Sequence, residues 1–381
     1  MPSVFQLPLS KPSTGETLQK IDGPIKGRGT SWKIEHRFTT ESHEACDDGW
    51  GTLEQESADE RAPPTTQIIE QHVKSIVASN DSPDISFDLT INPYRGCEHG
   101  CVYCFARPTH SYLNMSPGLD FETRIIAKVN AAERLRNEFG KRSYQAKLLN
   151  VGAATDAYQP VERKLKITRS VIEVLADSRH PFSLVTKSSG VERDLDLIAP
   201  MAAQRLAAIY VSVTSLDGTL ARILEPRAAA PARRLQTIEA LARAGVPVGV
   251  SVSPIIPFIN EPEIERILEA AARAGASTAF GIVLRLPWEV NPIFQSWLQQ
   301  HFPDRAARVM ARMREMRGGR DYDASWGTRM RGEGIWAQLL AQRFKKATAR
   351  FELDRARVEL DLTQFRPPSS SAGDVQRGLF D

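Results

Sequence analysis

The sequence has few cysteines and no long uninterrupted hydrophobic run. Only four cysteines occur in 381 residues, which excludes the disulfide framework of a small secreted domain. The most apolar stretch, Val246–Ile259, is broken by Pro247, Pro254 and Pro257, so no segment is suited to crossing a membrane. The first residues also lack a basic start followed by an apolar core. We therefore expect a cytoplasmic protein without a membrane partner.

Three of the four cysteines lie close together in one run. Cys97, Cys101 and Cys104 form a C-x3-C-x2-C pattern, with Gly96 and Gly100 directly before the first two. Iron in a cubane cluster is normally held by four thiolates, so three cysteines on one loop leave one iron open to another ligand. Glycine adopts unusual backbone angles at low cost, which helps a short loop to wrap around a cluster. The pattern therefore predicts an iron–sulfur cluster with an open iron.

Two other interpretations of the triplet remain open at this point. A structural zinc ion would need a fourth ligand beside the three thiolates, and His99, His110 or Cys46 is available in the sequence. Alternatively, the three cysteines are ordinary buried thiols. The fold has to distinguish between an iron–sulfur cluster, a zinc ion and ordinary buried thiols.

The same run resembles the radical S-adenosylmethionine (SAM) superfamily, whose hallmark is Cys-x3-Cys-x-aromatic-Cys, with Tyr103 as the aromatic residue at the cluster edge. The resemblance implies a 4Fe-4S cluster on Cys97, Cys101 and Cys104 whose open iron binds the amino and carboxylate groups of SAM. An electron from the cluster then breaks the sulfonium bond and gives methionine and a 5′-deoxyadenosyl radical, which takes a hydrogen atom from a substrate. A reductant such as flavodoxin or ferredoxin is the implied electron donor.

The wider run Asn92–Pro108, with Thr155–Glu162 and Leu224–Arg227, is similar to the branch related to spore photoproduct lyase, often labelled DNA repair photolyase-like. The resemblance implies a lyase-like reaction on a nucleic acid. That lyase uses a further cysteine to return a hydrogen atom, but no cysteine follows Cys104 here, so Tyr158 is the expected hydrogen donor. Radical modification of RNA or protein, or a DNA-binding module with a structural cluster, remain the alternatives.

Short apolar runs alternate with amphipathic segments through the middle of the chain. Strands are expected at 87–91, 146–151, 182–186, 208–213, 247–253 and 279–286. Helices are expected at 120–139, 166–177, 191–203, 230–244 and 261–274. In the first helix, Asp120 is placed to cap, and Phe121, Ile125 and Val129 recur on one face. The alternation predicts an α/β fold with a parallel sheet, and the resemblance implies a partial (β/α)6 TIM-type barrel.

Polar residues that follow these strands are candidates for binding SAM, because active residues of parallel βα folds collect at the carboxyl ends of strands. The candidates are Gly152, Thr155, Asp156, Lys187, Ser212 and Arg227. The resemblance places the first three where the superfamily meets the methionyl amino group, although a Gly-Gly-Glu sequence is absent and Thr155 and Asp156 would have to serve. Lys187 could pair with the carboxylate, Ser212 with the ribose, and Arg227 with a carboxylate or phosphate. Each could also be an ordinary loop residue.

Charge and composition divide the chain into four expected parts. These are a polar N-terminal extension (1–83), the partial barrel (84–290), a basic helical region (291–360) and a flexible tail (361–381). In the helical region, helices are expected at 292–301, 304–316 and 335–348. Its arginines, among them Arg317, Arg320, Arg329 and Arg331, are typical of a surface that binds a polyanion, or of a solvated helical face.

The tail ends in Gln376-Arg-Gly-Leu-Phe380 after a Pro/Ser-rich leash. This pentapeptide resembles the bacterial sliding-clamp-binding motif through Gln376, Leu379 and Phe380, and departs from it at Arg377 and Gly378. In such motifs the two apolar side chains fill a cleft on the clamp. A sliding clamp is therefore an expected partner, and the alternatives are a tail that folds back on its own domain or one without a role.

Overall fold

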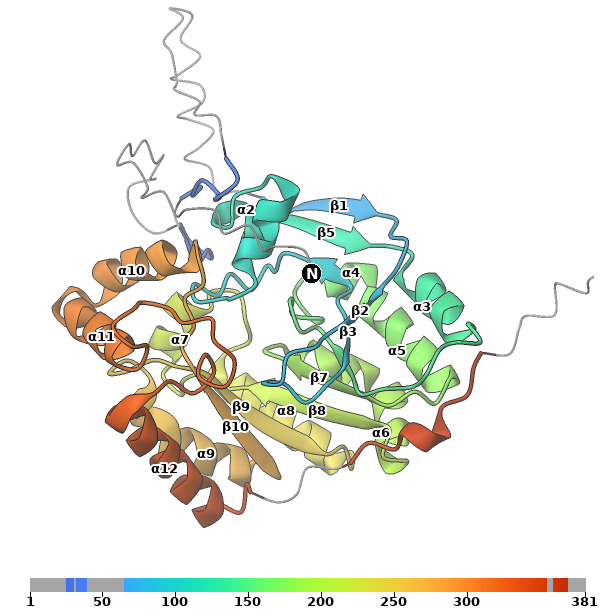
Figure 1. The fold of residues 1–381 in the computed structure, drawn as a ribbon. Helices are drawn as coiled ribbons and strands as arrows, with labels where there is room; N and C mark the ends of the chain where they lie inside the picture. The colour runs from blue at the N-terminus through green and yellow to red at the C-terminus, as the bar shows by residue number, and fades with distance from the viewer. Residues whose placement is uncertain (1–24, 31, 40–64, 355–358, 369–381) are drawn as a thin grey trace, which may run out of the picture.

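The computed structural model describes residues 25–30, 32–39, 65–354 and 359–368. Its centre is a seven-stranded sheet with the order β10-β9-β8-β7-β6-β3-β2, in which β3, β6, β7, β8, β9 and β10 are parallel and β2 is antiparallel. The strands are β2 Val77–Ser79, β3 Leu89–Ile91, β6 Leu149–Val151, β7 Phe182–Thr186, β8 Ala207–Ser212, β9 Val248–Ile255 and β10 Thr278–Val283. The six parallel strands confirm the expected partial barrel (Figure 1).

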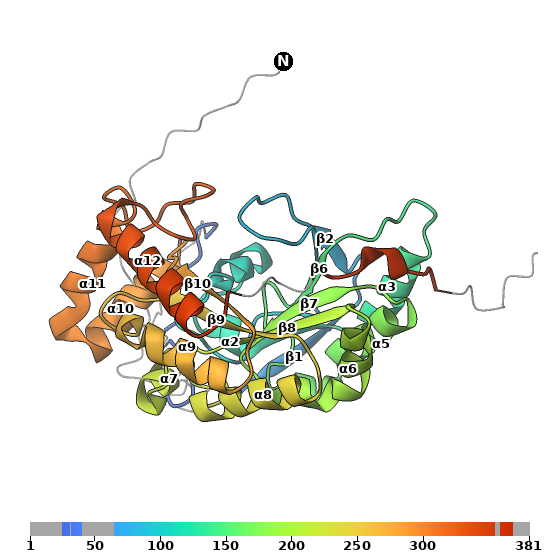
Figure 2. The same cartoon turned by 90° about the horizontal axis from the view of Figure 1, so that it is seen from below.

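Helices cover the outer face of this sheet as one layer (Figure 2). They are α3 Ala131–Phe139, α4 Glu162–Leu165, α5 Ile167–Asp177, α6 Leu195–Ala203, α7 Gly218–Leu224, α8 Pro231–Arg243 and α9 Ile264–Arg273, with short 3-10 helices η2 Ser189–Asp194 and η3 Glu261–Glu263. The core between the layers is aliphatic, and Ile209, Val211 and Val250 in it are fully buried. Alternation along the strands then turns the neighbouring side chains toward the concave inner face.

The expected helix at 120–139 is wrong, because a strand interrupts it. The chain forms α2 Leu119–Thr123, β5 Arg124–Lys128 and then α3. β5 pairs in parallel with β1 Gln67–Gln71 and antiparallel with β4 Tyr94–Arg95, in a separate three-stranded sheet. The apolar spacing suits a helix, but this pairing with distant strands prevails. Asp120 does not cap either; its carboxylate accepts from the backbone N–H of Ser116 at 2.9 Å.

The carboxyl-terminal region is helical as expected. α10 Val290–His301 and α11 Pro303–Glu315 follow β10, α12 Gly334–Arg350 packs on α9 and β10, and the short η4 Leu362–Gln364 lies near Arg205. Phe294 and Trp297 of α10 are buried, and the indole of Trp297 donates to the carbonyl of Ile223 at 3.0 Å. No helix of the described ranges is long and apolar enough to cross a membrane. The expected four-part division of the chain remains a prediction, and β1 and β2 lie inside its first part.

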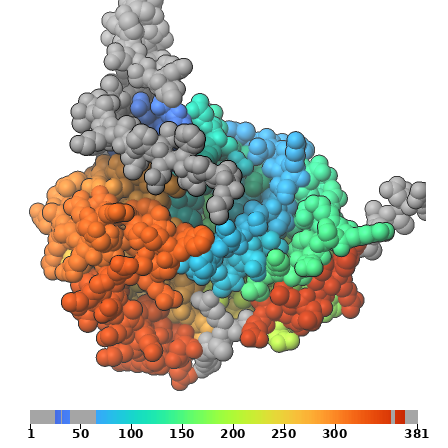
Figure 3. Space-filling view, in the orientation of Figure 1, coloured from blue at the N-terminus to red at the C-terminus, as the bar shows by residue number. Residues whose placement is uncertain are grey.

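Contacts between two loops join the two edges of the sheet. Asp84, after the edge strand β2, pairs with Arg329 at 2.5 Å and accepts from the backbone N–H of Gly327 at 2.6 Å. Arg317 is buried and donates to the carbonyls of Thr328 and Leu284. On the face in Figure 3, orange and blue segments meet, and the surface is hollowed beside them. Arg317 and Arg329 thus hold the fold together, which corrects the expectation that they contact phosphates.

Candidate cofactor site at the cysteine loop

The three cysteines of the motif lie on one tight loop after β3. The backbone N–H of Cys97 donates to the carbonyl of Phe121 at 2.9 Å, that of Gly100 to Cys97 at 3.3 Å, and that of Cys104 to Cys101 at 3.2 Å. Cys97 and Cys101 are buried, Cys104 is half-buried, and all three are free thiols. Local turns therefore fold the loop back on itself and bring its three thiols into one region.

Two glycines make this loop conformation accessible. Gly96 has φ 79° and Gly100 has φ 67°, in the left-handed region that disfavours other residues. A Cβ atom on Gly96 would lie 2.9 Å from the carbonyl oxygen of Phe121, and one on Gly100 would lie 2.7 Å from a carboxylate oxygen of Glu122. Both the backbone angle and the close packing thus require glycine.

A fully buried ion pair supports the loop from behind. Arg107 pairs with Glu122 at 2.5 Å and donates to the carbonyls of Cys101 at 2.9 Å and Gly100 at 3.2 Å. The second carboxylate oxygen of Glu122 accepts from the backbone N–H of Gly29 at 2.9 Å. Burial raises the pKa of Glu122, while Arg107 opposes that shift. The carboxylate of Glu122 and the loop carbonyls together satisfy the hydrogen-bond donors of the buried Arg107 guanidinium, as a buried charge requires.

The docked amino-terminal segment allows a direct test of this packing. A Cβ atom on Gly29 would lie 1.7 Å from the carbonyl oxygen of Gly100, so we expect Gly29→Ala to lower the free energy of unfolding by about 1–3 kcal/mol, measured by urea denaturation. Gly218→Ala is the matched control, because nothing lies within 4 Å of its added Cβ. If Gly29→Ala leaves the stability of the protein and the protease resistance of the segment around Gly29 unchanged, the close approach of Gly29 to Gly100 is contradicted.

A second buried charged group holds Tyr103. Its hydroxyl donates to Glu225, which also pairs with Arg234. Arg234 in turn donates to the carbonyl of Ser212 at the end of β8, at 3.1 Å. The ammonium of Lys187 lies 5.9 Å from the centre of the Tyr103 ring. This chain of contacts fixes the cysteine loop against the ends of β7 and β8.

Burial dominates the electrostatics of the three thiols. It raises the pKa of Cys97 and Cys104, and that of Cys101 to about 12. The positive charge of Lys187 opposes the shift at Cys101 and Cys104. Burial would lower the pKa of Lys187, but Cys101 and Glu225 hold it above its ordinary value. Deprotonating three neighbouring buried thiols requires a strong positive charge among them, which a metal cluster provides.

The barrel register places two of the expected SAM-binding residues on one face. Lys187 continues the alternate positions of β7 that include Val185, and Val185 lies opposite Tyr210 of β8. Ser212 has the same parity as Tyr210, so Lys187 and Ser212 both belong to the concave face. The fully buried Thr214 continues this row, and its hydroxyl has no partner among the described residues. A buried hydroxyl without a partner on the concave face suits a site for a polar cofactor.

Asp156 lies beside the loop with its carboxylate fully engaged. One oxygen accepts from the hydroxyl of Thr186 at 2.7 Å, and the other accepts from the backbone N–H of Lys187 at 2.7 Å and lies 3.3 Å from Nδ1 of His99. Burial would raise the pKa of Asp156, but His99 and the hydrogen bonds hold it below its usual value. Its negative charge raises the pKa of the neighbouring Cys97. Asp156 therefore joins the loops after β6 and β7.

Gly152 and Thr155 support the cysteine loop. The Thr155 hydroxyl donates to the carbonyl of Gly96 at 2.7 Å, and the backbone N–H of Gly152 donates to Ile91 at 2.8 Å. Gly152 has φ 84°. Gln159, absent from our sequence-based candidates, donates to Gly96 at 3.2 Å and accepts from Glu98. The Thr155 hydroxyl thus gives its proton to the cysteine loop, and its expected contact with the SAM amino group stays a prediction.

Arg227 faces outward from the same group of loops. It pairs with Glu98 at 3.0 Å, and its backbone N–H donates to the carbonyl of His99 at 3.2 Å. It lines a small cavity of about 100 Å³, together with His99, Tyr158, Pro160, Arg163, Ser188, Ser189, Ala228 and Ala229. The ion pair ties the loop after α7 to the cysteine loop. A part of the Arg227 side chain remains accessible to an anion in this cavity.

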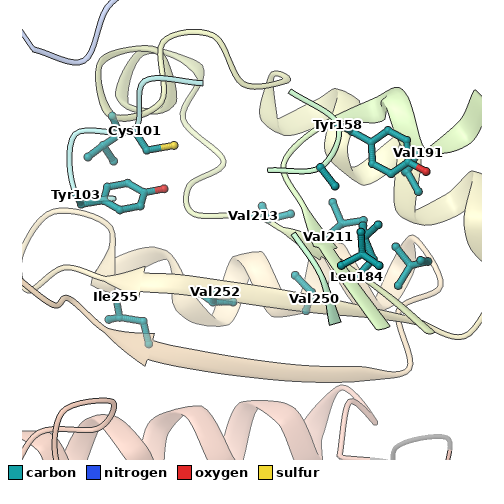
Figure 4. Close-up of a cluster of buried hydrophobic side chains, with 14 of the residues drawn as sticks. Cys101, Tyr103, Tyr158, Leu184, Val191, Val211, Val213, Val250, Val252 and Ile255 are labelled. Atoms are coloured by element: carbon teal, nitrogen blue, oxygen red, sulfur yellow. The ribbon is translucent and has the colours of Figure 1, made fainter. Parts of the chain in front are cut away.

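Tyr158 does not suit the expected role of hydrogen donor. Its hydroxyl donates to Asp194 at 2.9 Å, and Asp194 also pairs with Arg193 and Arg169. Figure 4 shows the hydroxyl pointing away from Cys101. Tyr158 is buried and its ring packs beside the loop after β7. The sequence position after a strand indicated the right end of the barrel, but not the direction of this side chain.

The geometry disfavours a mononuclear zinc site. Among the residues that the structure describes, no three His, Cys, Asp or Glu side chains converge as a single metal ion requires. His110 is engaged with the carbonyl of Arg124 at 3.1 Å, and His99 with Asp156. Cys46, the third candidate for a fourth ligand, lies outside the described residues.

Sequence reasoning missed the buried charges that hold the site. Arg107 and Arg234 are the two largest fully buried side chains of the described chain, and each has a carboxylate partner, Glu122 and Glu225. Charged residues are rarely buried unless paired, so they did not stand out. Their positions in the sequence could have marked two of these residues as parts of the site. Arg107 lies inside the run around the cysteines, and Glu225 lies inside Leu224–Arg227.

Comparison with known proteins identifies the family. Residues 91–271 match the model of the Radical SAM superfamily. An uncharacterised protein of Mycobacterium tuberculosis (strain H37Rv) is 36% identical over 255 residues, which is 65% of this chain and 74% of that protein. The chain belongs to the radical SAM superfamily. Another uncharacterised protein, of Methanocaldococcus jannaschii, is 26% identical over 62% of this chain and 85% of its own length.

Solved structures agree on the fold of this radical SAM protein. A variant of spore photoproduct lyase has a TM-score of 0.54 at 18% identity, covering 75% of this chain and 80% of that one. The same lyase complexed with a dinucleoside spore photoproduct has a TM-score of 0.52 at 17% identity, covering 74% and 79%. Radical SAM enzymes use a 4Fe-4S cluster and SAM. The three free thiols of the loop and the unpartnered hydroxyl of Thr214 on the concave face fit these cofactors.

Proposed function

We propose that this radical SAM enzyme holds its 4Fe-4S cluster on Cys97, Cys101 and Cys104 and acts on a nucleic acid in a lyase-like reaction. One observation carries the proposal: three free thiols, two buried and one half-buried, lie on a single loop beside the ends of the barrel strands. When bound, the cluster and SAM supply reductive one-electron cleavage of the sulfonium bond, which starts radical chemistry. The protein's own residues position these partners and keep water away from them.

The side chains around the loop have distinct roles in this proposal. Lys187 places a positive charge beside Cys101 and Tyr103, where it would stabilise the thiolates and the carboxylate of bound SAM. Ser212 lies on the same face and would hydrogen-bond the ribose of bound SAM. Arg107 and Glu225 hold the loop and Tyr103 in place from the protein side. Arg227 remains a candidate for an anionic group of the substrate.

The shape of the concave face supports a polar, planar substrate. Asn150 donates to the hydroxyl of Ser183 at 3.0 Å, and Tyr210 lies edge-on to Phe280 with ring centres 5.4 Å apart. Hydrogen-bonding groups and aromatic rings are the two features with which proteins bind extruded bases. The fold likeness to a lyase crystallised with a dinucleoside adds support for the same substrate class.

The substrate class is tested by stimulated turnover. We expect anaerobically reconstituted protein with dithionite and SAM to form 5′-deoxyadenosine slowly alone, and several times faster when a substrate nucleic acid is present. Single-stranded DNA, duplex DNA carrying ultraviolet lesions and RNA are compared, with transfer of deuterium from labelled nucleotides into 5′-deoxyadenosine as the second readout. Turnover that no nucleic acid changes and no deuterium transfer would contradict the proposed substrate and favour modification of a protein.

Three expected properties remain proposals. Reductive cleavage needs an electron from outside the chain, so a small donor such as flavodoxin or ferredoxin is the proposed partner. Sliding-clamp binding through Gln376, Leu379 and Phe380 concerns residues outside the described ranges. A cytoplasmic location suits an oxygen-sensitive cluster and also remains a prediction.

A further inference from the structure

Exposed aromatic side chains gather at one place on the described surface. Five large aromatic residues are exposed among the described residues: Phe38 (50%), Phe105 (48%), Tyr112 (69%), Trp288 (61%) and Trp326 (57%). All except Trp326 lie on or beside two segments, 105–113 after the cysteine motif and 284–289 after β10. Exposed aromatics concentrated in this way mark an interaction surface. We name the four residues Phe38, Phe105, Tyr112 and Trp288 the aromatic seam.

Direct contacts join the two segments along the seam. Near the cysteine loop, the guanidinium of Arg285 lies 5.2 Å from the centre of the Phe105 ring. Farther out, Arg37 forms an ion pair with Glu289 at 3.0 Å and contacts the rings of Tyr112 and Trp288, whose centres are 5.1 and 4.5 Å away. In Figure 1 the amino-terminal segment that carries Arg37 lies between α2 and α10.

Arg37 fixes the outer rings in place. It also lies 4.6 Å from the centre of the Phe38 ring, and its backbone N–H donates to Glu289 at 3.1 Å. Phe38 and Tyr112 are 5.3 Å apart between ring centres. Three exposed rings are therefore ordered around one arginine whose charge is paired with Glu289. Ordered rings lose little conformational freedom when a flat ligand stacks on them.

Trp288 carries an additional sign of function. Its φ is 45°, in the left-handed region that a bulky residue occupies only at a cost. Its side chain is exposed, so burial of the indole does not compensate for that backbone conformation. Strained, exposed residues of this kind are concentrated at binding sites.

Arg285 offers a cation at the inner end of the seam. Its amino groups contact only the sulfur of Met330 at 3.7 Å and the hydroxyl of Tyr322 at 3.4 Å. Its buried Nε–H has no partner among the described residues. Asp84 and Arg317 are charged groups near Arg285, but among the described residues no carboxylate forms an ion pair with it. Its free donor can therefore bind an anion such as phosphate. It stands over Phe105, which directly follows Cys104.

We infer that the aromatic seam binds a single-stranded or locally unpaired nucleic acid by stacking its bases, and that Arg285 binds a phosphate and leads the strand to the cysteine loop. The inference rests on the proposed nucleic-acid substrate and names its form. Sequence-tolerant binding of single strands combines aromatic platforms with cationic groups along the backbone. The seam has this combination, and its inner end is next to a cluster ligand.

Fluorescence anisotropy of labelled single-stranded oligonucleotides of about 12 nucleotides tests the seam, because such sites cover about 4–16 nucleotides. Anaerobically reconstituted full-length protein is titrated into oligothymidine and oligouridine. We expect Tyr112→Ala and Trp288→Ala each to weaken binding about 5-fold to more than 100-fold, as loss of one base-stacking ring does. Trp288→Phe should restore most of the affinity.

Two controls make this result specific to the seam. Trp326→Ala removes an equally exposed ring that is not part of the seam and should leave the affinity unchanged. Arg285→Gln should weaken binding and reduce its dependence on salt concentration, because one phosphate contact is lost. A duplex of the same sequence should bind more weakly than the single strand.

The outcomes separate the seam from the substrate proposal. Strong binding by unsubstituted protein that Tyr112→Ala and Trp288→Ala leave unchanged would overturn the seam and keep the nucleic-acid substrate. No binding of any DNA or RNA would overturn both. Unchanged oligonucleotide binding with slower cluster reduction by flavodoxin in the same variants would assign the seam to the electron donor, against the inference.

Discussion

Cys101→Ala is expected to abolish formation of 5′-deoxyadenosine from SAM by the reconstituted protein. A cubane cluster with one open iron depends on three thiolates from the chain, and Cys101 is the middle residue of the loop that supplies them. Its replacement by alanine leaves two thiolates on the loop, which are too few to hold the cluster. Iron and sulfide content and the absorbance of the cluster are measured together with the product, by mass spectrometry.

Cys46→Ala is the matched control for this prediction. Cys46 is the only cysteine outside the motif, so its replacement should leave iron content and 5′-deoxyadenosine formation unchanged. Equal loss of metal in both variants would instead indicate a four-cysteine site, as the zinc interpretation with Cys46 as the fourth ligand requires. A Cys101→Ala protein that still cleaves SAM would refute the assignment of the three cysteines.

Arg107→Met is expected to cost about 3–5 kcal/mol of the free energy of unfolding, because it leaves the carboxylate of Glu122 buried without its partner. Both side chains are fully inaccessible, and Arg107 also holds the carbonyls of Gly100 and Cys101. The loop should lose its geometry with the pair, so cluster incorporation should fall as well. Urea denaturation and iron content are the two measurements.

A double variant separates the charge effect from the loss of packing. Arg107→Met combined with Glu122→Leu removes both charges, and should regain a large part of the lost stability. An exposed pair gives the scale: Arg273 and Glu269 are 77% and 40% exposed, and Arg273→Met should cost less than about 1 kcal/mol. If Arg107→Met is no more destabilising than Arg273→Met, the buried pair does not support the loop.

The sheet of the barrel could be predicted because its strands are locally distinct. β7 and β9 are short, largely apolar runs that contain valines and are separated by amphipathic helices, so composition and spacing were sufficient. β5 could not be predicted in this way. Its Ile125 and Ile126 continue a spacing that suits a helix, and only pairing with β1, more than fifty residues earlier in the chain, makes them a strand.

The site was predictable in position but only partly in detail. The cysteine motif and the strand-end rule indicated the correct rim of the barrel, and Lys187 and Ser212 lie on its concave face. The side chains of Thr155 and Tyr158 turn to Gly96 and Asp194 instead. Such directions depend on neighbours from other loops, which a single sequence does not specify.

The buried ion pairs were beyond local sequence reasoning for the same cause. Arg107 and Glu122 are fifteen residues apart, and Glu225 and Arg234 are nine apart. Each charge is compatible with a solvated surface until the fold encloses it. Glu162, which can be interpreted as a surface residue, is buried and accepts the hydroxyl of Tyr94.

Mössbauer spectroscopy of protein reconstituted with 57Fe tests the central claim most directly, which is that three cysteines hold a 4Fe-4S cluster whose remaining iron is open to SAM. The account predicts that adding SAM changes the spectrum of a single iron site and leaves the sites bound to Cys97, Cys101 and Cys104 as they were. A cluster whose spectrum is identical with and without SAM, in protein that contains its full complement of iron, would contradict it.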